Sequence, residues 1–172
     1  MKLKIGDMAP SFSAESVNSG TISLEDYRGK KVLLAFGRYF GCPVCQIEFQ
    51  MLQDMLKENV LDVQVIYVVQ SAPDVAKAFA EEKGAEFPII AVKRDGGKWP
   101  IYSDYGVGKF SLAALPKVAK RAKEAYSQGI VHGPKEGSET QSPAEFIIDE
   151  NGKITYANIG LLETDKLLNA LK

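Results

Sequence analysis

Runs of mainly hydrophobic residues alternate, along the first half of the chain, with segments that have helical periodicity. The runs at 31–36, 63–69 and 87–92 are rich in β-branched residues and are typical of strands buried on both faces of a sheet. Between them, the apolar positions of 43–58 and 73–84 recur at the spacing of one helix face. This alternation predicts a sheet that contains parallel strands, with helices as right-handed crossovers.

Turn-forming residues predict a hairpin near each end of the chain. Ser19-Gly20 lies between two short extended segments and predicts an N-terminal hairpin. Near the other end, Asn151-Gly152 separates the apolar runs 146–149 and 154–157, which is a strong hairpin signal. A last amphipathic segment predicts a closing helix from Glu163.

The region between these parts, residues 93–142, interrupts the alternation because it contains no convincing strand pattern. An apolar stripe over 112–126 predicts a helix, and its basic face is interpreted as solvated, with partner docking as the alternative. Residues 129–142 are rich in glycine and predict a long loop, which in a compact domain is usually functional or mobile. The basic residues of the helix are Lys117, Lys120, Arg121 and Lys123.

Composition narrows the classes of function. The 21 basic residues balance 22 acidic ones among 172, so no strong field attracts nucleic acid or an anionic membrane, and neither partner is expected. No apolar run suits a signal peptide or a membrane span, which predicts a cytoplasmic protein. In that compartment a cysteine pair is more often catalytic or metal-binding than a structural staple.

The two cysteines, Cys42 and Cys45, lie three positions apart, between the buried run 31–36 and the helix 43–58. Cys42 falls at the N-cap region and Pro43 in the first turn, where free backbone amides and the helix dipole favour a thiolate. A thiolate attacks disulfides and peroxides, and this spacing lets the second sulfur resolve the product on the first.

The cysteine pair also has three alternative interpretations. Two inert buried cysteines are disfavoured by the spacing and placement. A closed zinc site needs about four ligands, and the single histidine, His132, is distant in sequence and is interpreted as a solvated loop residue. A metal or iron–sulfur cluster shared by two chains, each giving two thiolates, stays open.

Several motifs give the chain a family resemblance that covers nearly its whole length. The motifs are Gly6–Phe12, Ile22–Lys30, Gly41–Cys45, Tyr102–Val107 and Phe146–Asp149. They resemble the peroxiredoxins of the alkyl hydroperoxide reductase/thiol-specific antioxidant (AhpC/TSA) superfamily, in the branch that carries a Cys-x-x-Cys. The resemblance implies an α/β fold of the thioredoxin-like class, peroxiredoxin branch. Residues 1–172 are then a single thioredoxin-like domain with a central mixed β-sheet flanked by helices, an N-terminal β-hairpin and a helical and loop insertion at about 93–142.

Within this resemblance, Cys45 falls where peroxiredoxins place the peroxide-reactive cysteine, and Glu48 follows as the family often has it. The family motif Pro-x-x-x-Thr-x-x-Cys is altered, because Arg38 stands at the proline position and Cys42 at the threonine position. Pro143 replaces the arginine expected three residues before the late strand. These departures argue against fast peroxidase activity. Arg38 is nevertheless a candidate cationic donor to the peroxide, from another direction than the missing family arginine.

A comparison with thioredoxin gives the same residues different roles. Cys42 takes the place of the exposed attacking cysteine and Cys45 that of the resolving one. Pro143 stands where thioredoxin carries its cis-proline beside the disulfide. A cis X–Pro bond is uncommon, so this is a sharp expectation.

The sequence therefore predicts a thiol-dependent oxidoreductase, a peroxiredoxin-like antioxidant that cycles Cys42 and Cys45 between dithiol and disulfide to reduce hydroperoxides or disulfides. The alternatives are a thioredoxin-like disulfide reductase without peroxidase activity, or the cluster-binding homodimer. Cys45 attacks first in the peroxidase version and Cys42 in the reductase version. Arg38 and Pro143 complete the candidate catalytic set. No cofactor is expected; the expected partners are a thiol donor such as thioredoxin or glutathione, and a second copy, since peroxiredoxins commonly dimerise.

Overall fold

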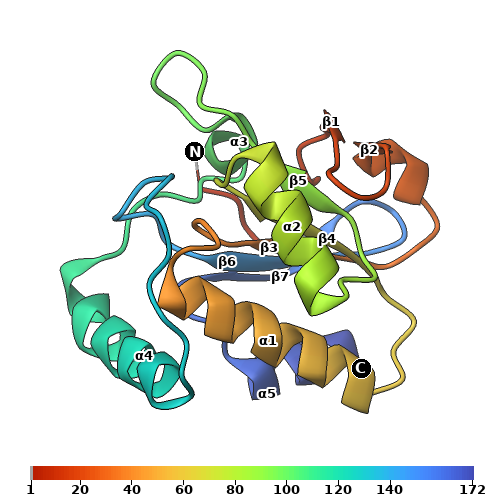
Figure 1. The fold of residues 1–172 in the computed structure, drawn as a ribbon. Coiled ribbons are helices and arrows are strands. Elements are labelled where there is room, and N and C mark those ends of the chain that lie inside the picture. Colours follow the sequence, from red (N-terminus) through yellow and green to blue (C-terminus); the bar gives the residue numbers. More distant parts are fainter. Residues whose placement is uncertain (1) are drawn as a thin grey trace.

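A five-stranded mixed sheet forms the centre of the molecule, in the computed structural model that describes residues 2–172 (Figure 1). Its strand order is β5-β4-β3-β6-β7; β3, β4 and β5 are parallel, while β6 and β7 run antiparallel to their neighbours. The N-terminal strands β1 and β2 form a separate antiparallel hairpin. The strands are β1 (Ser13–Glu15), β2 (Thr21–Ser23), β3 (Val32–Phe36), β4 (Gln64–Val69), β5 (Ile89–Ala91), β6 (Ala144–Ile148) and β7 (Ile154–Ile159).

Helices cover both faces of this sheet. Helices α1, α2 and α5 pack on one face, α3 packs on the other, and α4 lies beside the N-terminal half of α1 (Figure 1). The α-helices are α1 (Pro43–Glu58), α2 (Pro73–Lys83), α3 (Pro100–Asp104), α4 (Leu115–Ser127) and α5 (Thr164–Leu171). Short 3-10 turns at Leu24–Tyr27 and Leu112–Ala114 complete the description.

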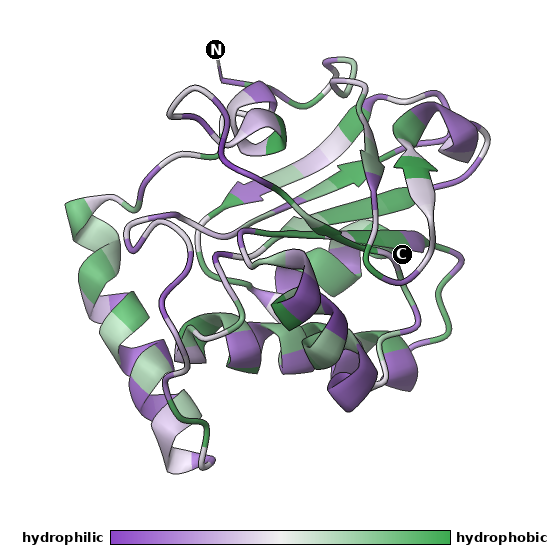
Figure 2. Ribbon diagram, turned by 45° about the horizontal axis from the view of Figure 1, so that its top comes forward, coloured by the Kyte–Doolittle hydropathy of each residue, from purple (hydrophilic) through white to green (hydrophobic). Residues whose placement is uncertain are grey.

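The strand β3 shows why the sheet is buried on both faces. Successive side chains of a strand point to opposite faces, so Leu33 and Ala35 meet the core beneath α1, while Leu34 and Phe36 meet the core beneath α3. All five residues of β3 are buried, which confirms the prediction from its unbroken apolar run. Figure 2 shows hydrophobic residues concentrated in the central strands and hydrophilic residues on the outer helix surfaces.

Most predicted elements are confirmed, together with the mixed α/β fold class. Helix α1 has the predicted limits, and α2 ends at Gly84, whose left-handed φ of 62° caps the helix. Both hairpins form, and within 93–142 the structure has helices and isolated bridges but no strand of the sheet. Helix α4 accounts for the predicted helix of this insertion. Residues 129–142, which we call the strap, then pass the N-terminal end of α1 (Figure 1).

Candidate redox site

The two cysteines occupy the first turn of α1, directly after the loop that leaves β3. Cys42 is the N-cap residue, with extended backbone angles, and Pro43 takes the first helical position, where no amide proton is needed. Cys45 lies one turn further along. Both are free thiols and both are buried, with 1% and 4% of their surface exposed. The exposed Cys42 implied by the comparison with thioredoxin is therefore wrong, because Tyr39, Val44 and apolar residues of α4 pack around the cysteine pair.

Arg38, two residues beyond β3, contacts both sulfur atoms. Its guanidinium donates a hydrogen bond to Cys42 Sγ at 2.7 Å, and its backbone N–H donates to Cys45 Sγ at 3.3 Å. A second guanidinium N–H donates to the backbone carbonyl of Glu139 in the strap. The structure thus brings the cation suggested by the sequence to Cys42 rather than to Cys45.

These contacts divide the two thiols into a strong and a weak acid. The pKa of Cys42 is lowered to about 6, first by the hydrogen bond from the Cys45 S–H and then by the charge of Arg38, which together outweigh burial. The pKa of Cys45 is raised well above its usual range, because its proton is held by Cys42 and because the group is buried. At neutral pH the pair therefore consists of a Cys42 thiolate and a Cys45 thiol.

The strap approaches the cysteine loop closely enough to require glycine on both sides. The N–H of Gly133 donates to the carbonyl of Gly41 at 2.8 Å. A side chain at Gly41 would overlap the carbonyl oxygen of Pro134. The loop predicted from the sequence to be functional or mobile thus packs directly against the residue that precedes Cys42.

Polar contacts hold the strap on the site. The buried Tyr39 donates its hydroxyl proton to the carboxylate of Glu139 at 2.6 Å and lies 3.4 Å from Nε2 of His132. His132 is exposed, as predicted, yet it touches the site through Tyr39. Sequence reasoning missed Tyr39 and Glu139, whose meeting depends on segments about a hundred residues apart.

A second anchor, Gln70 at the end of β4, was also missed. Its side-chain oxygen accepts from the backbone N–H of Ser138 at 2.8 Å, and its amide nitrogen donates to Gln141 at 3.0 Å. Gln70 is 3% exposed, and a fully polar side chain directly after a buried strand is the sequence signal that could have found it. The end of β4 thus secures the same strap that Arg38 contacts.

Pro143 is buried at the end of the strap, immediately before β6. The pairing of Ala144 with Phe36 sets this end of β6 beside the end of β3, where the cysteine loop starts. Every peptide bond within residues 2–172 is trans, so the expected cis bond at Pro143 is wrong. Trans is the preferred state of an X–Pro bond, and here the residues on both sides of it are held by backbone hydrogen bonds, Ser142 N–H to Gly108 at 2.9 Å and Gly160 N–H to the Pro143 carbonyl at 2.9 Å.

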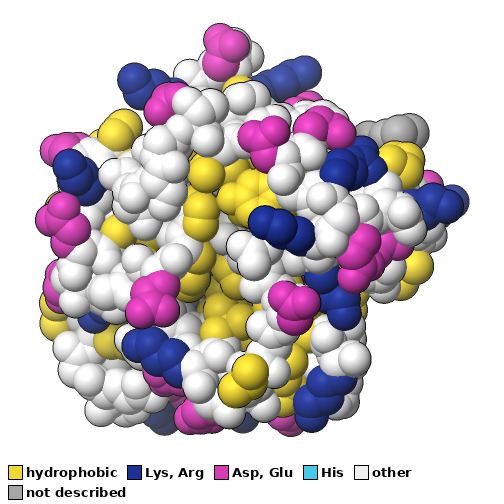
Figure 3. Space-filling view, turned by 90° about the vertical axis from the view of Figure 1, so that its right-hand side faces the viewer, with side chains coloured by type: hydrophobic (Ala, Val, Ile, Leu, Met, Phe, Trp, Pro, Cys, Tyr) yellow, Lys and Arg dark blue, Asp and Glu magenta, His cyan; other side chains and the backbone are white. Residues whose placement is uncertain are grey.

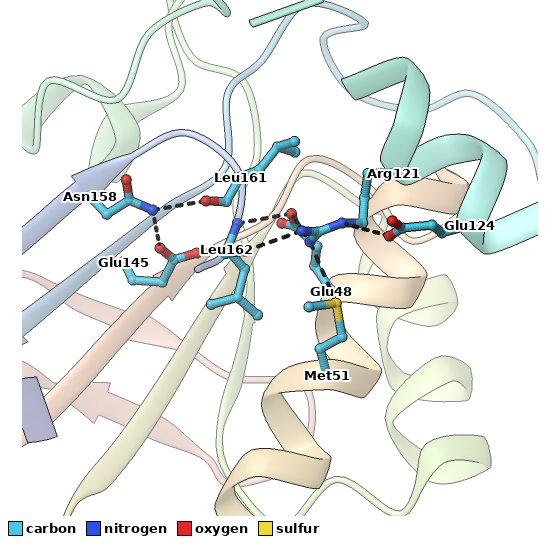
Figure 4. A network of polar contacts seen from close by, with 8 residues as sticks. All are labelled: Glu48, Met51, Arg121, Glu124, Glu145, Asn158, Leu161 and Leu162. Atoms are coloured by element: carbon cyan, nitrogen blue, oxygen red, sulfur yellow. Dashed lines mark hydrogen bonds and ion pairs between the residues drawn. The ribbon is translucent and has the colours of Figure 1, made fainter. Parts of the chain in front are cut away.

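A buried carboxylate, Glu48, lies one turn after Cys45 and joins three elements (Figure 4). Its Oε1 accepts from Arg121 of α4 at 2.9 Å and from the backbone N–H of Leu162 at 2.9 Å. Arg121 also pairs with Glu124 at 3.3 Å. The predicted solvated position of Arg121 is therefore wrong, since its side chain turns inward and pairs with the buried Glu48.

A second buried acid, Glu145 on β6, faces the same region and accepts a hydrogen bond from Asn158 at 2.8 Å (Figure 4). Burial raises the pKa of Glu48 to about 7, against the opposing effects of the Leu162 N–H and of Arg121. Burial, and then the charge of Glu48, raise the pKa of Glu145 well above its usual range. Burial thus disfavours the charged form of both acids.

The described residues offer little support for a metal site. Among residues 2–172 no three His, Cys, Asp or Glu side chains form a group that could hold a metal ion. A cluster shared by two chains would need both sulfur atoms at the surface, whereas the strap and Arg38 enclose them. The same residues include no helix long and apolar enough to cross a membrane.

Comparisons with known proteins agree with this geometry. The chain is 27% identical over 173 residues to the thiol-disulfide oxidoreductase ResA of Bacillus anthracis, covering 99% of this chain and 79% of ResA. Its fold is similar to that of a thiol peroxidase from Chromobacterium violaceum, with a TM-score of 0.69, 14% identity, and 99% and 87% of the two chains covered. It is also similar to the peroxidoxin BcpB from Mycobacterium tuberculosis, with a TM-score of 0.64, 16% identity, and 98% and 96% covered.

The structural likenesses, at these identities, establish the thioredoxin-like fold alone. The family assignment comes from the sequence, since the pattern of the AhpC/TSA family matches residues 5–157. Its relatives include both proteins named as peroxiredoxins and proteins named as thiol-disulfide oxidoreductases. With its Cys42 thiolate beside a Cys45 thiol, this chain belongs to the AhpC/TSA family and is a thiol-based oxidoreductase.

Proposed function

We propose that the chain reduces hydroperoxides through Cys42 as the first nucleophile and Cys45 as the resolving thiol. The observation that carries this proposal is the 2.7 Å contact between the Arg38 guanidinium and Cys42 Sγ. It favours the thiolate on Cys42 and leaves the proton on Cys45. This order differs from the one implied by the peroxiredoxin resemblance, in which Cys45 reacts first.

The reaction follows from these protonation states. The Cys42 thiolate attacks the outer oxygen of the hydroperoxide, the O–O bond breaks, and the sulfur becomes a sulfenic acid. The other oxygen leaves as an alkoxide or hydroxide that takes up a proton, and the Arg38 guanidinium is placed to stabilise its developing charge. Cys45 then attacks the sulfenic sulfur, water leaves, and a disulfide forms. A thiol reductant returns two electrons and restores the dithiol.

Burial favours a small oxidant. Cys42 is 1% exposed beneath the strap, so a hydroperoxide reaches it with less rearrangement than a folded protein disulfide would need. Pro143, at the end of the strap and beside the end of β3, is proposed as part of the wall along which the oxidant approaches. Hydrogen peroxide is the smallest member of this substrate class and makes the sharpest probe.

A second candidate function is disulfide reduction, which the likeness to ResA over almost the whole chain favours. In this reaction the Cys42 thiolate attacks one sulfur of the substrate disulfide, and Cys45 then displaces the substrate from the mixed disulfide. Both candidates use Cys42 first. They differ in the oxidant, so one set of variants separates them.

Rapid mixing of pre-reduced protein with hydrogen peroxide or glutathione disulfide tests the proposal. Cys45→Ser isolates Cys42 and should form a trappable sulfenic acid at a rate orders of magnitude above that of a free thiol. Cys42→Ser should react slowly with both oxidants. Slow peroxide reaction with fast disulfide exchange in Cys45→Ser would replace the first candidate with the second. Fast peroxide oxidation of Cys42→Ser would show that Cys45 is the first nucleophile.

A further inference from the structure

Helix α4 and the short turn before it form a segment that lies against the cysteine pair. We call residues 111–128 the lid. Val118 and Ala122 of the lid pack against the apolar cluster that contains Cys42 and Cys45. A reagent that approaches the cysteines from the side of α4 therefore meets these two side chains first.

The chain enters and leaves the lid at positions that are fixed to the rest of the fold. Just before the lid, the N–H of Phe110 donates to the carbonyl of Thr140 at 2.9 Å. Just after it, the side-chain amide of Gln46 in α1 donates to the carbonyl of Val131 at 3.3 Å. Gly129, with a φ of 80°, separates the helix from the second of these points. Because glycine tolerates wide changes of backbone angle, the lid can move while both of its ends stay in place.

Few residues of α4 attach the lid to the body of the fold. Ala125 is buried, Val118, Arg121 and Ala122 are partly buried, and the remaining residues of α4 are exposed. The apolar side chains among these four are small, so they remove much less surface from water than the large buried residues of α1 do. A segment with so few buried apolar contacts opens locally at a lower cost in free energy than unfolding of the whole chain.

Arg121 is the polar contact that holds α4 in place (Figure 4). Its guanidinium donates to Glu48 at 2.9 Å and to the carbonyl of Leu162 at 3.4 Å, and its side chain is 17% exposed. Within residues 2–172, Arg121 supplies every side-chain hydrogen bond and ion pair that joins the lid to the rest of the chain. The strap has the separate anchors described above. Loss of this one side chain should therefore free the lid and leave the strap in place.

Two cavities bear on how the sulfur atoms are reached. A groove of about 540 Å³ separates the basic side of α4 from residues 158–163, so on this side the lid borders open space rather than packed side chains. The face of the molecule turned away from α4 has hydrophobic side chains gathered in a hollow (Figure 3). The cavity of about 570 Å³ between β1 and β5 is lined by those strands and by the starts of α2 and α3, and by neither cysteine. That cavity therefore does not reach the sulfur atoms.

We propose that the lid opens independently of the strap, and that Arg121 is the positioning residue that holds it closed and so selects the reactants of Cys42 by size. The closed lid admits a small molecule such as hydrogen peroxide, and the open lid admits a protein-sized thiol or disulfide. The catalytic cycle needs both states, because a thiol donor must reach the disulfide that the oxidant leaves. The inference rests on Cys42 as the reactive thiol of the proposed function, but not on which oxidant it reduces.

Alkylation with reagents of two sizes tests the lid. Cys45→Ser leaves Cys42 as the single thiol, and its reaction is followed with N-methylmaleimide and with the same maleimide coupled to a polymer of protein size. The readout is the ratio of the two rates, bulky over small, because a change in the thiolate fraction alters both rates alike. We expect Arg121→Met to raise this ratio about tenfold.

Two matched variants separate the role of Arg121 from a general effect of charge. Lys120→Met removes the same charge from the exposed side of α4 and should leave the ratio at its value in the parent protein. Arg121→Lys keeps a cation beside Glu48 and should restore most of the selectivity.

Hydrogen exchange shows which segment moves. In Arg121→Met the amides of α4 should exchange faster, while the N–H of Ser138, which bonds Gln70, and the amides of the central strands keep their wild-type rates. In the wild-type chain, the amides of α4 should already exchange faster than that of Ser138.

Three outcomes would overturn the proposal: an unchanged ratio in a folded Arg121→Met variant, the same rise in Lys120→Met, or exchange that accelerates equally in α4 and in the central strands. Circular dichroism establishes whether each variant is folded. If Arg121→Met does not fold, equal protection of α4 and Ser138 in the wild-type chain would be decisive against the lid. Because no measurement here uses an oxidant, a failure of peroxide reduction is seen separately from a failure of the lid.

Discussion

Two buried ionisable sites in this molecule each contain an arginine, and they respond in opposite ways. At the cysteine site, Arg38 lies 2.7 Å from Cys42, whose pKa falls to about 6. At the carboxylate site, Arg121 lies 2.9 Å from Glu48, whose pKa nevertheless rises to about 7. A cation at similar distance thus accompanies a lowered pKa in one place and a raised pKa in the other.

The difference lies in the remaining neighbours. Cys42 accepts a hydrogen bond from the Cys45 S–H, the largest single influence on its pKa, and this bond stabilises the charged form. For Glu48, burial is the largest influence on its pKa and the charge of Cys42 raises that pKa further, while Arg121 divides its interactions between Glu48 and Glu124. Burial therefore prevails at the two carboxyl groups and is outweighed at Cys42.

The largest expected effect comes from removing the cation at the cysteine site. Arg38→Met leaves the Cys45 hydrogen bond but removes the neighbouring charge, so the pKa of Cys42 should rise toward its usual value of 9.0. A new pKa of about 8 would lower the thiolate fraction at pH 7 about tenfold. Titration of the ultraviolet absorbance of the thiolate measures this change without requiring access to the sulfur.

Arg38→Lys is the matched control for this prediction. It keeps the charge but replaces the planar guanidinium, which bonds Cys42 and Glu139 at once. Its pKa should lie between those of the wild type and Arg38→Met. An unchanged titration in Arg38→Met would show that the cation has no part in forming the thiolate.

The carboxylate site should reveal itself in the pH dependence of stability. Glu48 keeps its proton up to about pH 7 in the folded chain but loses it near 4.5 when unfolded. The folded state then binds more protons between these values, so the free energy of unfolding falls as pH rises, by about 3 kcal/mol. Glu48→Gln should flatten this part of the curve, measured by denaturant unfolding of the reduced protein at each pH.

The cysteine site contributes with the opposite sign, which gives an internal control. Because the pKa of Cys42 is lowered, its stabilising effect is complete above its usual value of 9.0 and is lost as pH falls through about 6. Cys42→Ser should abolish the rise in the free energy of unfolding that Cys42 causes, and should leave the decrease between pH 4.5 and 6 unchanged. The same slope in Glu48→Gln as in the wild type over that range would contradict the role given to Glu48.

A smaller effect should follow from disturbing the contact between the strap and the cysteine loop. In Gly41→Ala the new methyl group meets the Pro134 carbonyl, so the strap must shift, with a loss of about 1–3 kcal/mol in stability. Gly108→Ala is the control, because a side chain there meets open space. Alkylation of Cys42 by a bulky maleimide should accelerate in Gly41→Ala alone; equal rates in both variants would mean that the strap does not limit access.

The smallest expected effect concerns the hydroxyl of Tyr39. Tyr39→Phe removes the 2.6 Å hydrogen bond to Glu139, an exposed carboxylate that water can solvate instead. The free energy of unfolding should fall by about 0.5–1.5 kcal/mol, measured in denaturant, while the pKa of Cys42 stays near its wild-type value. A large shift of that pKa would place Tyr39 in the electrostatic site rather than in the attachment of the strap.

The local order of the chain was readable from its sequence. The unbroken apolar run of β3, the helical spacing of α1 and the Asn151-Gly152 turn each depend on residues close together along the chain. Local patterns of this kind determine strand, helix and turn before any packing is considered. The position of Cys42 at a helix N-terminus, and hence its thiol chemistry, followed from the same patterns.

Tertiary structure decided what surrounds the sulfur atoms. The backbone of Glu139 meets Arg38 across 101 positions, and Arg121 reaches Glu48 across 73. Pro143 meets the end of β7 through the Gly160 N–H, and its peptide bond is trans. A pKa is set by every charge and donor within a few ångströms, whatever their separation in sequence. The sequence therefore determined that the two cysteines share one helix N-terminus, and only the folded chain decided which of them is the stronger acid.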